Sequence, residues 1–165
     1  MIISSPAFAS NQPIPPEYAY SDEQKHPVNP PLTFYNIPPG TKSLSLVMDD
    51  PDAKGGTFVH WLLWNLSPKK LSIQKGECMR LKHCGLNGYN KTGYAGPNPP
   101  LQEEHRYFFR LYALNVKLDL KIGSIHEDLN LAMGGHILEQ TNIFGVFKKP
   151  VTNYEAKKYA PKIFK

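Results

Sequence analysis

A rigid loop that runs directly into an aromatic strand is the feature that most constrains this chain. The loop, Gly93–Pro100, has two glycines, which allow close backbone approach, and three prolines, which fix φ and remove donors. The segment that follows, His105–Leu114, is rich in Tyr and Phe and predicts a β-strand. Alternation at period two gives this strand one shared face, formed by His105, Tyr107, Phe109, Leu111 and Ala113. Two polar rings therefore stand at the mouth of an apolar interior, which is a common way to build a ligand pocket.

Composition agrees with a fold made of strands and loops. The 165 residues include 16 Pro, 12 Gly, 9 Tyr and 8 Phe, which fits a β protein better than a helix bundle. The length predicts a single domain, residues 1–165, with a basic C-terminal tail at residues 150–165. The net charge of +5 is moderate and the lysines are dispersed, so we interpret them as solubilising and expect no nucleic-acid partner.

The cysteines and the hydropathy pattern predict a cytoplasmic protein. Cys78 and Cys84 are the only cysteines, too few for a disulfide framework in a chain of this size. The N-terminal residues carry no basic region followed by an unbroken apolar run, so no signal peptide is predicted. No apolar stretch approaches the roughly twenty residues that a transmembrane helix needs.

Short strands are predicted at Ile2–Ile3 and Leu32–Tyr35. Two longer segments, Ser43–Asp50 and Thr57–Leu66, are predicted to be core strands that carry ionisable side chains. In Ser43–Asp50 the apolar side chains alternate, and the same phase points Asp50 inward and Asp49 outward. A buried carboxylate costs several kcal/mol, to an order of magnitude, unless it is paired.

Thr57–Leu66 is apolar on both faces and predicts a central strand. Simple alternation would give it one face that consists of Phe58, His60, Leu62 and Trp64.

The rest of the chain predicts a long connection, one helix and a closing strand. Residues 67–90 have little pattern and are interpreted as a connection with at most a short strand. Ser124–Glu127 has the form of a capping box and predicts a helix from about Ile125 to Thr141, with two glycines inside it. Ile143–Phe147 reads as the closing strand.

The ionisable groups at the strand ends fit three kinds of chemistry. In the first, protonated His60 and His105 bind a small anion, while the aspartates orient both rings and raise their pKa values. In the second, one histidine is the general base of a hydrolase, although no serine or cysteine in these motifs offers a nucleophile. In the third, two histidines and two aspartates form a tetrahedral metal site. We expect the first, without enzymatic activity, metal or cofactor.

Several segments, in order along most of the chain, resemble the phosphatidylethanolamine-binding protein family, in particular its bacterial and archaeal Raf kinase inhibitor-like members. They are Ser5–Phe8, Asn29–Leu32, Asp50–Ala53, His60–Trp61, Gly93–Pro100, His105–Tyr107, Leu111–Leu114 and Gly135–Leu138. The resemblance implies a mainly β, Greek-key-like fold, in which a large antiparallel sheet packs on a smaller one with one or two peripheral helices. It also implies a small pocket for phosphate-like or carboxylate anions, including phospholipid headgroups.

The resemblance assigns ligand-binding roles to seven residues: Asp50, Asp52, His60, Gly96, Pro97, His105 and Tyr107. The family usually has a proline after Asp-Pro-Asp-Ala, where this chain has Lys54, and Asn98 replaces a different small residue. We therefore expect a small-anion binding protein, a monomer or homodimer, with a regulatory or kinase-inhibitor-like role; the alternative is a hydrolase. A protein partner cannot be transferred from these motifs, because surfaces outside them would carry it.

Overall fold

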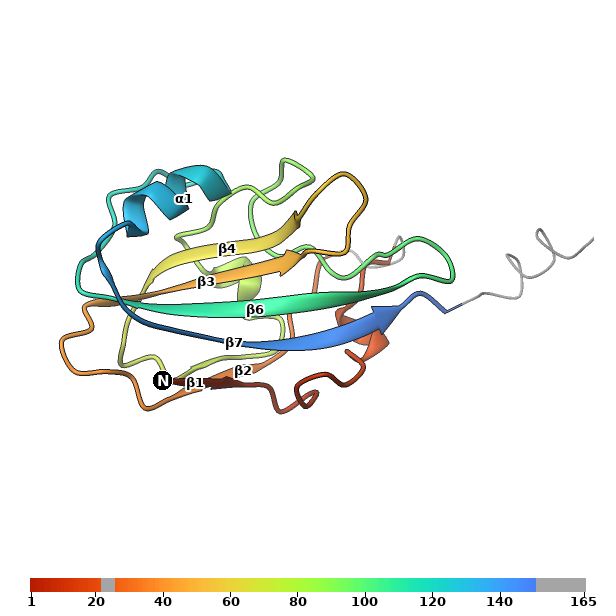
Figure 1. Ribbon diagram of the computed structural model, residues 1–165, viewed down its shortest axis with the longest axis horizontal. Coiled ribbons are helices and arrows are strands. Elements are labelled where there is room, and N and C mark those ends of the chain that lie inside the picture. The colour runs from red at the N-terminus through yellow and green to blue at the C-terminus, as the bar shows by residue number, and fades with distance from the viewer. Residues whose placement is uncertain (22–25, 151–165) are drawn as a thin grey trace, which may run out of the picture.

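The computed structural model describes residues 1–21 and 26–150 and consists mainly of two antiparallel sheets (Figure 1). The larger sheet has the strand order β4-β3-β6-β7. Its strands are β3 (Ser43–Asp50), β4 (Phe58–Leu66), β6 (Glu104–Leu114) and β7 (Ile137–Lys148). The smaller sheet has the order β1-β2-β5, with β1 (Ile2–Ser4), β2 (Leu32–Tyr35) and β5 (Ser72–Ile73).

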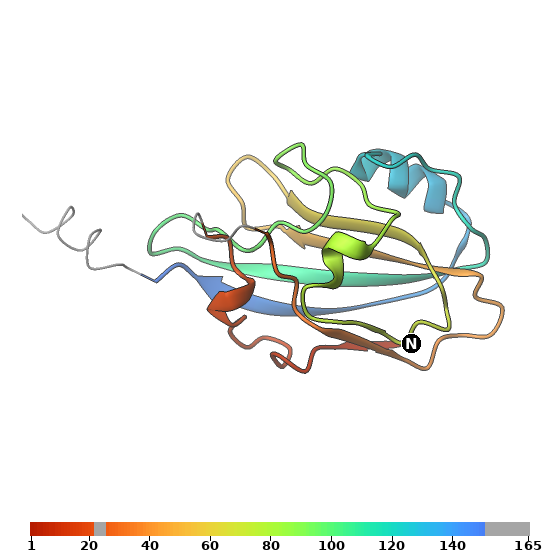
Figure 2. The ribbon, with the colours of Figure 1, turned by 180° about the vertical axis from the view of Figure 1, so that it is seen from behind.

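The main hydrophobic core lies between the two sheets. In Figure 2, which shows the molecule from behind, the red and orange strands of the smaller sheet, β1 and β2, lie below the larger sheet. Ile3, Phe34 and Ile73 of the smaller sheet belong to the same buried cluster as Leu46 and Phe109 of the larger sheet. The alternating apolar residues of β3 and β6 therefore supply one wall of this core, as their period predicts.

The single α-helix among residues 1–21 and 26–150, α1 (His126–Met133), covers part of the other face of the larger sheet (Figure 1). Leu129 and Met133 of α1 pack with Val47, Leu62 and Trp64 in a second buried cluster. Two short 3-10 helices, η1 (Pro16–Tyr18) and η2 (Glu77–Arg80), lie in the connections. The predicted mainly β fold, a large sheet on a smaller one with a peripheral helix, is confirmed. Within the described ranges, no helix has the length and apolar character needed to cross a membrane.

A β-bulge in β4 sets the position of His60. Met48 of β3 pairs with Trp61 of β4. The next residue of β3, Asp49, pairs with Val59, so that His60 is an extra residue in the ladder. Such an insertion bends the strand and redirects the side chains on either side of it.

Because of the bulge, the prediction of which side chains share one face of β4 is wrong. Alternation would put Phe58, His60, Leu62 and Trp64 together. The structure separates them, because the first two line a pocket on the inner side of the sheet and the last two pack under α1. Asp49 lies on the opposite face of β3 from Asp50, as predicted, but it is not exposed there, because it is buried and paired with Arg110 of β6.

The helix is shorter than predicted. It ends at Met133 because Gly134 and Gly135 follow, and Gly135 has a φ of 74°, a conformation that terminates helices. Ile137, which the sequence assigned to the helix, begins β7. At the other end the Asp128 carboxylate accepts a hydrogen bond from the Ile125 N–H, so the reciprocal acid is Asp128 and not the predicted Glu127. Apart from Pro150, the predicted basic tail lies outside the described residues.

Candidate functional site

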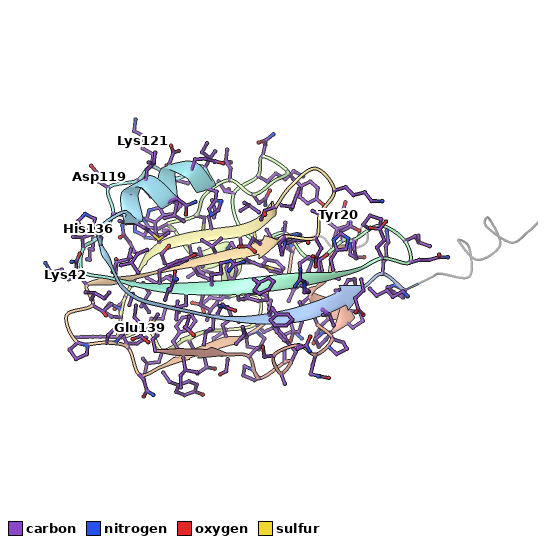
Figure 3. The ribbon with its side chains drawn as sticks, viewed as in Figure 1. Tyr20, Lys42, Asp119, Lys121, His136 and Glu139 are labelled. Atoms are coloured by element: carbon purple, nitrogen blue, oxygen red, sulfur yellow. The ribbon has the colours of Figure 1, made fainter. Side chains whose placement is uncertain are left out.

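The site lies where β3 ends and where β4 and β6 begin. Antiparallel pairing of Asp50 with Phe58, and of Asp49 with Phe108, brings these three strand ends to one end of the sheet. A pocket of about 100 Å³ opens there. Its walls are formed by Asp50, Ala53, Lys54, Phe58, His60, Tyr89, Asn98, Pro99, Pro100, His105 and Tyr107. In Figure 3 the labelled Tyr20 lies at this end of the molecule, and its ring is 6.4 Å from that of Tyr89.

A buried pair of His105 and Asp50 forms the floor of the site. The Nδ1–H of His105 donates to Oδ2 of Asp50 at 2.7 Å, and the side chains are each only 5 % exposed. The other carboxylate oxygen of Asp50, Oδ1, accepts the backbone N–H of Asp52 at 2.9 Å. Both oxygens are thus paired, which offsets the cost of burying this acid.

The second ring nitrogen of His105, Nε2, contacts Glu103, which in turn forms an ion pair with Lys54. Nε2 lies 3.3 Å from Oε2 of Glu103, and Oε1 of Glu103 accepts from Nζ of Lys54 at 2.7 Å. Burial lowers the pKa of His105, but the hydrogen bonds and charges of Asp50 and Glu103 outweigh it, so the pKa is raised overall. The pKa of Glu103 is lowered, first by Lys54 and then by His105.

His60 has a different electrostatic environment. Its Nδ1 lies 2.8 Å from the carbonyl oxygen of Ala95, and since a carbonyl only accepts, Nδ1 carries the hydrogen. Burial lowers the pKa of His60 more than the hydrogen bond to Ala95 and the charge of Asp50 raise it, which favours the neutral ring. The expectation that the aspartates raise the pKa values of both histidines holds only for His105.

Tyr107 contributes a buried hydroxyl. The residue is fully buried, and its hydroxyl has no hydrogen-bond partner of ordinary geometry among the described residues. Burial, and then the charge of Asp50, raise the pKa of Tyr107, which keeps the phenol protonated. A buried hydroxyl in a pocket wall is a donor that a ligand can use.

The remaining three residues implied by the family resemblance lie beside the pocket and do not line it. The carboxylate of Asp52 accepts three hydrogen bonds from Arg106, which, despite partial burial, hold the pKa of Asp52 at about 2. A Cβ on Gly96 would lie 2.6 Å from backbone atoms of residues 18–20, so this glycine permits a close backbone approach. The carbonyl of Pro97 accepts the Tyr20 N–H at 2.9 Å and ties the loop to the same segment.

Several wall residues were missed by the sequence analysis. Phe58 was assigned to a core face, and Tyr89 comes from a connection without periodicity, as does Glu103, which does not line the pocket but contacts Nε2 of His105. The Tyr89 ring packs edge-on against Phe58, with ring centroids 4.9 Å apart. Tyr89 and Asn98 also line an adjoining cavity of about 710 Å³, so these two residues form a wall that the two cavities share. The one feature of the sequence that could have indicated the contact between Glu103 and His105 is the acidic pair Glu103-Glu104, which directly precedes His105.

Metal ligation was one alternative from the sequence. In the parts of the chain that the structure describes, no three side chains of His, Cys, Asp or Glu are grouped so as to hold a metal ion. Asp50 is directed at His105, and Asp52 at Arg106.

Comparisons with known proteins identify relatives along most of the chain. A family model described as "Phosphatidylethanolamine-binding protein" matches residues 4–148. A "UPF0098 protein" of Methanothermobacter thermautotrophicus is 37% identical over 154 residues, which cover 90% of this chain and 99% of that protein. A second UPF0098 protein, from Chlamydia pneumoniae, is 38% identical over 155 residues and has the same coverage of both chains, 90% and 99%.

Solved structures give the same result. The crystal structure of a putative phosphatidylethanolamine-binding protein homologue from Chlamydia trachomatis has a TM-score of 0.81 and 36% identity, and covers 90% of this chain and 97% of that one. The Escherichia coli protein YbcL, described as a new member of the mammalian PEBP family, has a TM-score of 0.81 at 21% identity, with coverage of 90% and 98%, and supports the fold alone. From the family match and these relatives, the chain belongs to the phosphatidylethanolamine-binding protein family.

Proposed function

We propose that this protein binds a small anion, of the phosphate or carboxylate type, in the pocket between Asp50, His60, His105 and Tyr107. The observation that carries the proposal is the pair of donors at the pocket. His105 is held by Asp50 at Nδ1, which leaves Nε2 with only a long contact of 3.3 Å to the Glu103 carboxylate, and the buried hydroxyl of Tyr107 has no hydrogen-bond partner of ordinary geometry among the described residues. Family membership supports a binding function in general.

Binding would replace one contact and add another. An anion that accepts from Nε2 of His105 takes the place of the Glu103 carboxylate, which now lies 3.3 Å from that atom. The hydroxyl of Tyr107 would supply a second donor. Charge-assisted hydrogen bonds contribute about 1.5–3 kcal/mol each, enough to favour a ligand over an exposed side chain that must also stay ordered.

The size of the pocket limits what enters it. A volume of about 100 Å³ admits the anionic group and little else. The remainder of a larger ligand, such as the glycerol or amine portion of a phospholipid headgroup, would extend past Tyr89 and Asn98 into the adjoining cavity. Neither serine nor cysteine is among the residues that line the pocket, which favours binding over nucleophilic catalysis.

The pH dependence of phosphate binding tests the proposal. His105 binds an anion in its charged form, and its pKa is raised, so affinity should be full below that pKa and should fall as the pH rises through it. Saturation with inorganic phosphate should in turn raise the pKa of His105 further, since the two equilibria are linked. Calorimetric titration, together with NMR titration of the imidazole, measures both quantities.

Two variants make the test specific. His105→Gln should weaken phosphate binding at least about tenfold, because a charge-assisted donor is lost. His136→Gln is the matched control, since His136 is a partly buried histidine at the opposite end of the molecule (Figure 3) with its own contact to Asn115. An affinity that stays flat between about pH 5 and 9, or equal losses in both variants, would contradict the proposal.

A further inference from the structure

We infer that the ligand must itself donate a hydrogen bond, to Nε2 of His60. The pocket therefore selects an oxyanion that carries a proton, namely inorganic phosphate or a phosphomonoester, over sulfate or a phosphodiester. The inference rests on the proposed function and narrows its ligand class.

The backbone fixes which nitrogen of His60 can meet a ligand. The ring Nδ1–H donates to the carbonyl of Ala95 at 2.8 Å, and the Ala95 N–H donates back to the carbonyl of His60, also at 2.8 Å. These two hydrogen bonds both connect His60 to Ala95 in the rigid loop, and together they fix the orientation of the His60 ring. Nδ1 is engaged, so Nε2 is the atom that the pocket-lining ring offers, and in the neutral tautomer it is an acceptor only.

The surroundings of His60 oppose a second proton. The ring is 3% exposed and lies against Phe58 and Tyr107, with centroids 4.8 Å and 5.1 Å away. The nearby charges are of mixed sign. Asp50 is already paired with the His105 ring, and Asp49 is paired with Arg110 on the other face of β3. A charged His60 would thus be desolvated beside a second imidazolium and have no carboxylate of its own.

The pocket then presents two kinds of partner to a tetrahedral anion. Nε2–H of His105 and the hydroxyl of Tyr107 are donors, and Nε2 of His60 is an acceptor. All oxygens of sulfate and of a phosphodiester only accept, so one of them would face the lone pair of His60. A phosphate that keeps one proton has the hydroxyl that this position requires. Sites built to bond a ligand hydroxyl reject analogues that lack it.

Two pairs of probes test the inference by calorimetric titration, and the methyl esters are the pair that is matched in charge. Inorganic phosphate is compared with sulfate, and methyl phosphate with dimethyl phosphate, which represents the diester linkage of an intact lipid headgroup. At about pH 5.5 the monoester still carries its second proton, so both methyl esters have one negative charge and differ in the P–OH group. We expect phosphate and methyl phosphate each to bind at least about tenfold more tightly than their partners.

A variant and a spectrum assign the selectivity to His60. The amide of His60→Gln can donate as well as accept, so discrimination in both pairs should fall below about threefold, whereas His136→Gln should keep it. In the wild-type protein, ¹⁵N NMR of His60 should show Nε2 without a proton both before and after phosphate is added, a readout that does not depend on folding of the variant.

The outcomes separate the inference from the function. Equal binding within both probe pairs, or uptake of a proton by His60 when phosphate binds, would overturn the inference and leave anion binding standing. If none of the four probes binds, the proposed function fails and the inference fails with it.

Discussion

At the scale of single residues, two histidines in one pocket differ because of what each Nδ1 contacts. His105 donates to the carboxylate of Asp50, which favours the charged ring. His60 donates to the uncharged carbonyl of Ala95, and burial therefore dominates its pKa. The same residue type thus supplies a cationic donor at one wall and a neutral acceptor at the other. A histidine's role is set by its neighbour and not by its presence in a motif.

The carboxylate of Glu103 is predicted to compete with an anionic ligand for His105. It occupies the donor of His105 that an anion would use, so Glu103→Gln should strengthen phosphate binding. For a solvent-exposed contact we expect a gain of about threefold to tenfold. Affinity is measured by calorimetry at about pH 5.5, where His105 is protonated in both proteins. In the free protein the same substitution should lower the pKa of His105, because one of its acceptors is removed.

The neighbouring Glu104 provides the control for charge. It is exposed, and in the described structure it makes no hydrogen bond or ion pair with His105 or Lys54, so Glu104→Gln removes an equal charge without opening the site. Equal gains in the two variants would show that general repulsion, and not occupancy of His105, limits binding.

At the scale of elements, the sequence predicts where strands lie better than how their faces turn. The alternation in β3, the two apolar faces of β4 and the aromatic content of β6 located these strands to within a residue. These features could not predict the bulge at His60, since a bulge is a property of the pairing between two strands. The helix was overextended because Leu and Ile spacing continued past Gly134-Gly135 into β7.

The loop that follows β5 and η2 and leads to β6 depends on one glycine. A Cβ on Gly96 would lie 2.6 Å from the backbone of residues 18–20, which cannot rotate away as a side chain can. Gly96→Ala should therefore reduce the free energy of unfolding by about 1–3 kcal/mol. For a chain of this length the melting temperature should fall by about 2–4 °C for each kcal/mol. Thermal unfolding followed by circular dichroism measures this, and an unchanged melting temperature would mean that no such close approach exists in solution.

At the scale of the whole molecule, the site exists only because the larger sheet brings separate segments together. Asp50 comes from the end of β3, His60 from the bulge in β4, and His105 and Tyr107 from the start of β6. The sequence could name these residues from their types and from the family resemblance. Their arrangement, and the contributions of Tyr89 and Glu103, depend on connections whose positions no periodicity encodes.

The central claim is that Asp50, His60, His105 and Tyr107 form one pocket that holds an oxyanion. A high-resolution crystal structure of the protein soaked in phosphate tests it most directly. Our account predicts phosphate between these side chains, with oxygens within hydrogen-bond distance, about 2.6–3.2 Å, of Nε2 of His105, the Tyr107 hydroxyl and Nε2 of His60, and with Glu103 displaced from His105. Phosphate bound only elsewhere on the molecule, while this pocket stays open and Glu103 remains on His105, would contradict it.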